Sequence, residues 1–140
     1  MGPVAKSAED MISIAVEGKV SETFGPTIGE WNPDASTGQR KRFNFLKDLL
    51  GLDEIPAGIQ YQLLHRTASA VLEAQRFNAK HAVLLVHSFS PEKLWFDDFA
   101  DFVMLFGKVP QIEKMVQAEG SRIPLLYFAW VQEDEPYLKR

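Results

Sequence analysis

Glu17 and Lys19 form the strongest candidate for a catalytic pair, because only Gly18 separates them at the end of a segment that alternates between apolar and polar residues. In a strand, a spacing of two places both side chains on one face, about 7 Å apart. A carboxylate there can hold Mg²⁺, and the neighbouring ammonium can orient or polarise a water for attack on a phosphodiester. The backbone carbonyl of Gly18 could serve as a further metal ligand. The same residues also fit a charge pair on a solvated strand, worth at most about 1 kcal/mol, and spacing alone favours that simpler interpretation.

Residues 11–20 must position this pair, and their alternation predicts a β-strand. One face is apolar and consists of Ile12, Ile14, Val16 and Val20. The other face carries both charges and consists of Ser13, Ala15, Glu17 and Lys19. The segment 21–37 is rich in glycine and proline, which predicts a loop with a short turn at residues 27–31.

The remaining elements alternate between helices and strands. Apolar spacing predicts one helix from about residue 37 to Gly51 and a second over residues 58–77. Residues 81–89 contain an uninterrupted apolar run, which is typical of a strand covered on both faces. The Ser90-Pro91 pair predicts the start of a helix that ends at Gly107. A short helix at 111–118, a last strand at 123–131 and a solvated tail at 132–140 complete the chain.

Helices that lie between strands predict an α/β fold, in which a mixed β-sheet with at least partly parallel strands is flanked by helices. The 140 residues have the length of a single domain, and 46% hydrophobic residues suffice for one core. Three strands make a thin sheet, and the chain starts almost directly on the first of them. We therefore expect that further strands precede this chain or that a partner supplies them.

Four runs of residues carry a family resemblance: VEGKV at 16–20, FGPT at 24–27, YQLLHRT at 61–67 and VHSFS at 86–90. The alternating strand with its Glu-x-Lys pair, the following helix and the buried strand together resemble the PD-(D/E)XK nuclease-like superfamily. The closer likeness is to a family of uncharacterised bacterial proteins, and it covers most of the chain from about residue 9 to Gly107. This resemblance implies a restriction-endonuclease-like core in which Glu17 binds a divalent metal such as Mg²⁺ and Lys19 assists the attacking water.

The chain departs from that superfamily in one respect, since its active members carry a further metal-binding Asp on the preceding strand. Only ten residues precede Met11, too few for such a strand and its turn. Asp10 lies along the same extended segment, about 23 Å from Glu17, and cannot share a metal with it. We therefore expect either an N-terminally shortened form of a longer protein or a domain that has lost catalysis. Glu22 and Glu30, in the loop after the pair, are weaker candidates to replace the Asp.

The helix at residues 58–77 contributes the remaining site candidates. Gln62 and Arg66 are four residues apart and share one helical face, with His65 about 100° round the helix from Arg66. The resemblance assigns to Gln62 the role of the polar residue that related nucleases press toward the metal and the scissile phosphate. Arg66 could grip a phosphate, with His65 beside it, but Arg66 could equally pair with Glu73 or a loop carbonyl.

Three further groups have both a functional and a structural interpretation. His87 and Ser88 end the buried strand, before a helix start that could attract an anion or that serines simply cap. The basic cluster at residues 40–42 could contact a phosphate backbone or form a solvated turn. The aromatic residues between 95 and 106 recur at helical spacing, which favours a core or an oligomer interface over a platform for stacking bases.

Composition excludes several classes of protein. The absence of cysteine removes disulfides and thiolate sites, and a net charge of −4 with a pI near 5.4 argues against non-specific coating of nucleic acid. With no targeting signal and no apolar stretch of about 20 residues, we expect a cytoplasmic protein that does not bind a membrane. The leading expectation is Mg²⁺-dependent hydrolysis of phosphodiesters in nucleic acid. The alternative is a catalytically inactive domain that binds a protein or a second copy of itself as a homo-oligomer.

Overall fold

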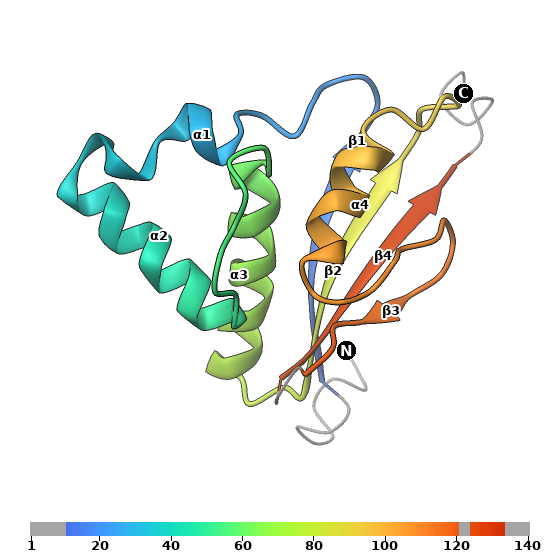
Figure 1. The fold of residues 1–140 in the computed structure, drawn as a ribbon. Coiled ribbons are helices and arrows are strands. Elements are labelled where there is room, and N and C mark those ends of the chain that lie inside the picture. Colours follow the sequence, from blue (N-terminus) through green and yellow to red (C-terminus); the bar gives the residue numbers. More distant parts are fainter. Residues whose placement is uncertain (1–10, 121–123, 134–140) are drawn as a thin grey trace.

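The computed structural model describes residues 11–120 and 124–133, which form a sheet with helices over one face (Figure 1). The elements in chain order are β1 (Ile12–Lys19), α1 (Ile28–Trp31), the 3₁₀ turn η3 (Pro33–Ala35), α2 (Thr37–Leu50), α3 (Tyr61–Arg76), β2 (His81–Ser88), α4 (Phe96–Met104), β3 (Val116–Gln117) and β4 (Leu125–Gln132). The predicted α/β class is confirmed. No helix within these two ranges is long and apolar enough to span a lipid bilayer.

The sheet contains four strands in the order β1-β2-β4-β3. β1 pairs with β2 and β2 with β4 in parallel, whereas the short β3 runs antiparallel to β4, so the predicted mixed sheet is confirmed. Parallel neighbours need long connections, and helices accordingly lie between β1 and β2 and between β2 and β4. β1 forms one edge of the described sheet, and Lys19 at its carboxyl end pairs with Ser88 of β2.

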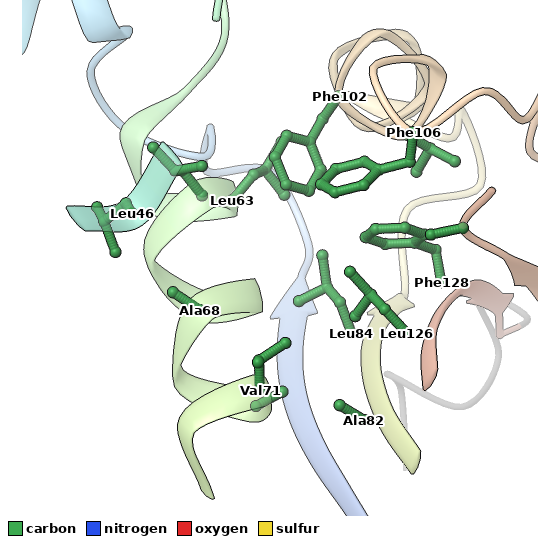
Figure 2. Close-up of a cluster of buried hydrophobic side chains, with 14 of the residues drawn as sticks. Leu46, Leu63, Ala68, Val71, Ala82, Leu84, Phe102, Phe106, Leu126 and Phe128 are labelled. Atoms are coloured by element: carbon green, nitrogen blue, oxygen red, sulfur yellow. The ribbon is translucent and has the colours of Figure 1, made fainter. Parts of the chain in front are cut away.

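The hydrophobic core lies between the sheet and the two helices α3 and α4 (Figure 2). The sheet contributes alternate residues of β2 and β4, each at most 5% exposed: Ala82, Leu84, Val86, Leu126, Phe128 and Trp130. On α4, Phe99 packs against Trp130 and Phe102 against Phe128, with ring centroids 5.4 and 5.8 Å apart. The aromatic row of residues 95–106 therefore belongs largely to the core, as its spacing favours.

α2 packs on the side of α3 that faces away from the sheet (Figure 1). Its limits agree with the prediction because both ends are capped. The Ser36 hydroxyl accepts a hydrogen bond from Gln39 N at 3.1 Å, and Gly51 ends the helix in the left-handed conformation with a φ of 70°. α3 is shorter than the predicted 58–77 at both ends but presents the expected apolar stripe to the core.

β1 turns its apolar side chains away from the helices. Ile12, Ile14 and Val16 are 55%, 53% and 55% exposed, whereas Glu17 and Lys19 on the opposite face are 9% and 2% exposed. The strand itself is confirmed, but the face with the two charged residues is the buried one. No helix in the described ranges lies over the apolar face, so β2, predicted to be covered on both faces, has helices over one face only (Figure 1).

The helix predicted to start at Ser90-Pro91 is correct only in its second half. α4 begins at Phe96, because Lys93 and Trp95 have positive φ values of 55° and 74°, which interrupt a helix. Ser90 instead closes a turn, in which its carbonyl accepts a hydrogen bond from Lys93 N at 3.0 Å. The predicted capping of this helix by Ser88 and Ser90 is therefore wrong.

The short helix predicted at residues 111–118 is wrong as well. Glu113 has a φ of 67°, and Val116–Gln117 forms β3, which pairs with Phe128 and Tyr127 of β4. The predicted last strand is confirmed as β4, which ends at Gln132. Most of the predicted tail, residues 134–140, lies outside the described residues.

Candidate functional site

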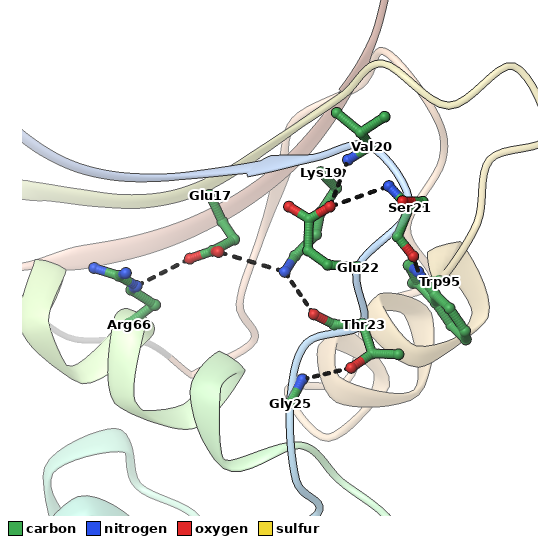
Figure 3. Close-up of polar contacts among 9 residues, drawn as sticks. All are labelled: Glu17, Lys19, Val20, Ser21, Glu22, Thr23, Gly25, Arg66 and Trp95. Atoms are coloured by element: carbon green, nitrogen blue, oxygen red, sulfur yellow. Dashed lines mark hydrogen bonds and ion pairs between the residues drawn. The ribbon is translucent and has the colours of Figure 1, made fainter.

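Glu17 and Lys19 lie at the carboxyl end of β1, on the face that α3 covers (Figure 3). Lys19 Nζ is 3.5 Å from Glu17 Oε2, donates a hydrogen bond to the Thr23 carbonyl at 2.8 Å, and lies 4.6 Å from the centre of the Phe24 ring. Both side chains are buried, so the interpretation of a charge pair on a solvated strand is wrong. An ammonium held by three partners in this way is a fixed positive charge at the end of the strand.

The loop after β1 is tied down around this ammonium. Glu22 Oε2 accepts hydrogen bonds from the backbone N–H groups of Ser21 at 3.0 Å and Val20 at 3.3 Å. Backbone N–H groups, first that of Glu22 itself and then that of Val20, hold the pKa of the Glu22 carboxyl below its ordinary value of 4.5. Trp95 Nε1 donates to the Ser21 carbonyl at 3.1 Å and so joins the loop to the start of α4 (Figure 3).

Arg66 approaches Glu17 from α3. Its Nε lies 2.9 Å from Glu17 Oε1, and the two groups form an ion pair. The Arg66 Nε–H group does not point at that oxygen, so the contact is not a hydrogen bond. Glu17 Oε1 is therefore a buried carboxylate oxygen without a hydrogen bond. The Arg66 side chain is 48% exposed, so it can exchange Glu17 for another anion without leaving a core. A buried oxygen with spare lone pairs beside an exposed guanidinium can receive a charged ligand.

A pocket of about 470 Å³ opens beside the pair. It is lined by Glu17 and Lys19, by the loop 22–26, and by Tyr61, Gln62, His65 and Arg66 of α3. Five of the six site residues proposed from the sequence thus line one pocket, whereas Gly18 does not and lies on the exposed side of β1. Of the α3 residues, Tyr61 and Gln62 belong to the first turn of the helix, where the helix dipole favours an anion.

Glu17 offers Mg²⁺ one carboxylate ligand, because its Oε1 has no hydrogen bond. Residues 11–120 and 124–133 hold no cluster of three or more acidic, histidine or cysteine side chains that could bind a metal, and Asp10 lies outside those ranges. Mg²⁺ commonly binds one or two carboxylates, with waters and substrate phosphates completing its shell. Because Lys19 and Arg66 neutralise the Glu17 carboxylate, Glu17 could hold a Mg²⁺ ion only together with a further anion such as a phosphate group.

Apart from Glu22, which lines this pocket, the other candidates from the sequence lie away from it. Glu30 accepts hydrogen bonds at the start of α1, where it completes a capping box. His87 Nε2 contacts Glu133 Oε1 at 3.2 Å, on the sheet face that no described helix covers. Arg40 of the basic cluster pairs with Asp34. None of these residues lines the pocket.

A larger cavity of about 740 Å³ lies near the end of α2. Its lining includes Leu49 to Leu52, residues 105–107 after α4, and Glu119, but no lysine or arginine among the residues described. Its lining also includes Gly120 and Pro124, between which the structure does not describe the chain. We therefore take the smaller pocket, which contains the buried charged pair, as the candidate functional site.

Three residues of the site were missed as site residues in the sequence. Thr23 contributes a backbone carbonyl, Phe24 a fully buried ring under the ammonium, and Tyr61 a ring on the pocket wall. A backbone acceptor leaves no signal in residue type. The sequence did contain a signal for Phe24, because an aromatic residue next to Gly25-Pro26 in a tight loop is expected to pack against a neighbouring side chain.

Comparison with known proteins identifies a family whose function is unknown. The model of DUF6946, described as a domain of unknown function, matches residues 3–135. Among curated proteins and among solved structures, nothing matches the chain. Because the family model spans nearly the whole sequence, the protein belongs to the DUF6946 family.

Proposed function

We propose that this pocket binds a phosphodiester group of a nucleic acid and hydrolyses it with the help of Mg²⁺. The observation that carries the proposal is the buried Glu17–Lys19 pair in a pocket that also contains Arg66. Burying opposite charges is costly for stability, so a buried ion pair on a pocket wall calls for a functional explanation. The resemblance of the Glu-x-Lys strand to PD-(D/E)XK nucleases supports the same reaction.

Arg66 and Lys19 supply the positive charge that a phosphodiester requires. Arg66 presents a planar fork of N–H donors and is exposed enough to turn from Glu17 to a phosphate oxygen. That turn would release Glu17 Oε1 for the metal. Gln62 lines the same pocket and can donate a hydrogen bond to a remaining phosphate oxygen.

In the proposed reaction, a water oxygen forms a bond to phosphorus while the bond between phosphorus and the leaving sugar oxygen breaks. The Lys19 ammonium, fixed by Thr23 and Glu17, orients that water and offsets the negative charge that grows on the phosphate. The proton lost by the water ends on the leaving oxygen. The chemistry that Mg²⁺ supplies when held by Glu17 is polarisation of the phosphate and a lower pKa for a bound water.

Cleavage of labelled single-stranded DNA, duplex DNA and RNA in MgCl₂, with EDTA as the blank, tests this proposal. We expect cleavage that Glu17→Gln abolishes, since glutamine keeps the shape of the side chain but not its charge. Glu73→Gln removes a carboxylate of α3 outside the pocket, where Glu73 pairs only loosely with Arg76 at 3.5 Å, and should retain the wild-type rate. Equal cleavage by Glu17→Gln and wild type, or no Mg²⁺-dependent cleavage by the wild type, contradicts the proposal.

The exposed apolar row of β1 favours a second candidate function, self-association through this face. Ile12, Ile14 and Val16 are each more than half exposed, and the row carries no charge because Glu17 and Lys19 point to the other face. Two copies could therefore place their rows against each other about a two-fold axis without burying an unpaired charge. In that case the protein is a dimerisation domain and the pocket is catalytically silent.

Analytical ultracentrifugation across a range of protein concentrations tests the second candidate. We expect a dimer that Ile14→Lys dissociates, because the new charge would lie in the middle of the buried row. Phe45→Lys is a matched control, since Phe45 is 52% exposed on α2, much like Ile14 at 53%. A wild-type protein that remains monomeric at high concentration rules out this candidate.

A further inference from the structure

An aromatic stack runs along one wall of the pocket, and the proposed reaction makes no use of it. The rings of Trp31 and Tyr61 are stacked, with centroids 4.4 Å apart and planes 19° apart. Tyr61 in turn stacks on His65, with centroids 5.8 Å apart and planes 24° apart. Tyr61 and His65 both line the pocket that contains Lys19 and Arg66.

The stack is anchored at one end and open at the other. Trp31 lies against the buried ring of Phe43 at 6.4 Å, and Tyr61 N donates a hydrogen bond to the Pro26 carbonyl at 3.0 Å. His65 is exposed, and Tyr61 is its ring partner in the described structure. A fixed stack whose last ring is exposed offers a flat surface to another planar group.

We propose that the exposed ring of His65 stacks an unpaired nucleobase of a single-stranded polynucleotide, while a phosphate of the same strand lies at Lys19 and Arg66. This inference rests on the phosphodiester site proposed above and narrows its substrate class. His65 and Arg66 are consecutive residues that line one pocket, so a base and its phosphate could be held side by side.

A single strand suits this arrangement better than a duplex. A base inside a duplex is already paired and stacked, and it would have to leave the helix to reach His65. The chain has a net charge of −4, which gives little general attraction to a duplex, so binding must depend on a few local contacts. Stacking on an aromatic ring supplies affinity that does not depend on base identity.

Fluorescence anisotropy in MgCl₂ tests the inference with three phosphorothioate probes, which resist cleavage: a short thymidine oligonucleotide, an abasic deoxyribose-phosphate strand of equal length, and a duplex. We expect the thymidine strand to bind most tightly. His65→Ala should weaken its binding roughly tenfold, a typical loss for one stacked base, and leave the abasic strand unchanged. His65→Phe should retain binding because it keeps a flat ring. His81→Ala, which removes an imidazole that packs on Tyr127 away from the pocket, is the matched control.

The outcomes separate the two proposals. Equal affinity for the thymidine and abasic strands, or no effect of His65→Ala, overturns the stacking site and leaves the phosphodiester site standing. Failure of every probe to bind the wild-type protein overturns both. Weaker binding of the abasic strand to His65→Ala than to the wild type also overturns the stacking site, since it would mean that His65 contacts the phosphate instead.

Discussion

Replacing Lys19 by methionine should destabilise the protein by about 2–4 kcal/mol. The change removes a charged hydrogen bond to the Thr23 carbonyl, worth about 1.5–3 kcal/mol, and leaves the buried Glu17 carboxylate without its buried partner. Methionine keeps most of the apolar stem, so the loss of packing is small. Arg66 remains 2.9 Å from Glu17, which keeps the cost below that of a fully uncompensated buried charge.

Urea unfolding measures this effect. With an m value of about 2 kcal/mol/M, the midpoint should fall by about 1–2 M without a change in m. Arg66→Met should cost at most about 1 kcal/mol because the arginine is half exposed, and Lys41→Met, an exposed lysine of α2, should change stability by less than about 0.5 kcal/mol. The double variant Glu17→Gln/Lys19→Met should recover part of the loss. If Lys19→Met is no worse than Lys41→Met, the buried pair does not exist as described.

Three further predictions test the fold and the loop around the site. Gly51→Ala should lower the free energy of unfolding, measured in urea, by about 1 kcal/mol, because Gly51 has a φ of 70°. Gly18→Ala should be neutral or stabilising, since a Cβ there meets nothing within 4 Å. Equal effects of the two changes would contradict the left-handed conformation of Gly51 at the end of α2. Leu84→Ala should cost about 2–5 kcal/mol and Ile14→Ala under about 1 kcal/mol, and the reverse order would show that the two faces of the sheet are misassigned. Because the pKa of Glu22 is lowered in the folded state, its contribution to stability is present above about pH 4.5 and is lost as the pH falls through the lowered value. The unfolding midpoint of Glu22→Gln should therefore depend less on pH in that acidic range than the wild-type midpoint does, and identical pH profiles would refute the loop hydrogen bonds.

Elements with their own stop signals were predictable from the sequence. α2 is one example, because the Ser36 cap and the left-handed Gly51 act within the helix itself. That some neighbouring strands run in parallel was also predictable, since helices lie in the connections between the predicted strands. Spacing made Glu17, Lys19, His65 and Arg66 candidates, and the resemblance to PD-(D/E)XK nucleases raised the first two and added Gln62; all five line one pocket.

The errors arose where long-range contacts decide the conformation. Ser90-Pro91 is a good helix start in isolation, but Lys93 and Trp95 adopt positive φ values on the way to α4. Residues 111–118 have helical spacing, yet part of the segment pairs with β4. Local pattern cannot show that a distant strand offers hydrogen bonds.

The polarity of β1 shows a further limit of pattern analysis. Alternation told us that the strand has two unlike faces, but not which of them the helices would cover. The apolar face of Ile14 would ordinarily be assigned to the core. Glu17 and Lys19 are buried instead, because contacts with Thr23, Phe24 and Arg66 offset the cost of removing their charges from water. Those contacts come from a loop and a helix beyond the strand.

The most direct test of the central claim is a calorimetric titration of Mg²⁺ into the protein together with a short phosphorothioate single strand, which resists cleavage. We expect binding at one site that needs both the strand and the protein and that disappears in Glu17→Gln, while Glu73→Gln binds like the wild type. Binding of Mg²⁺ that persists in Glu17→Gln, or no binding to the wild-type protein with the strand present, would contradict the assignment of this pocket as a Mg²⁺-dependent phosphodiester site.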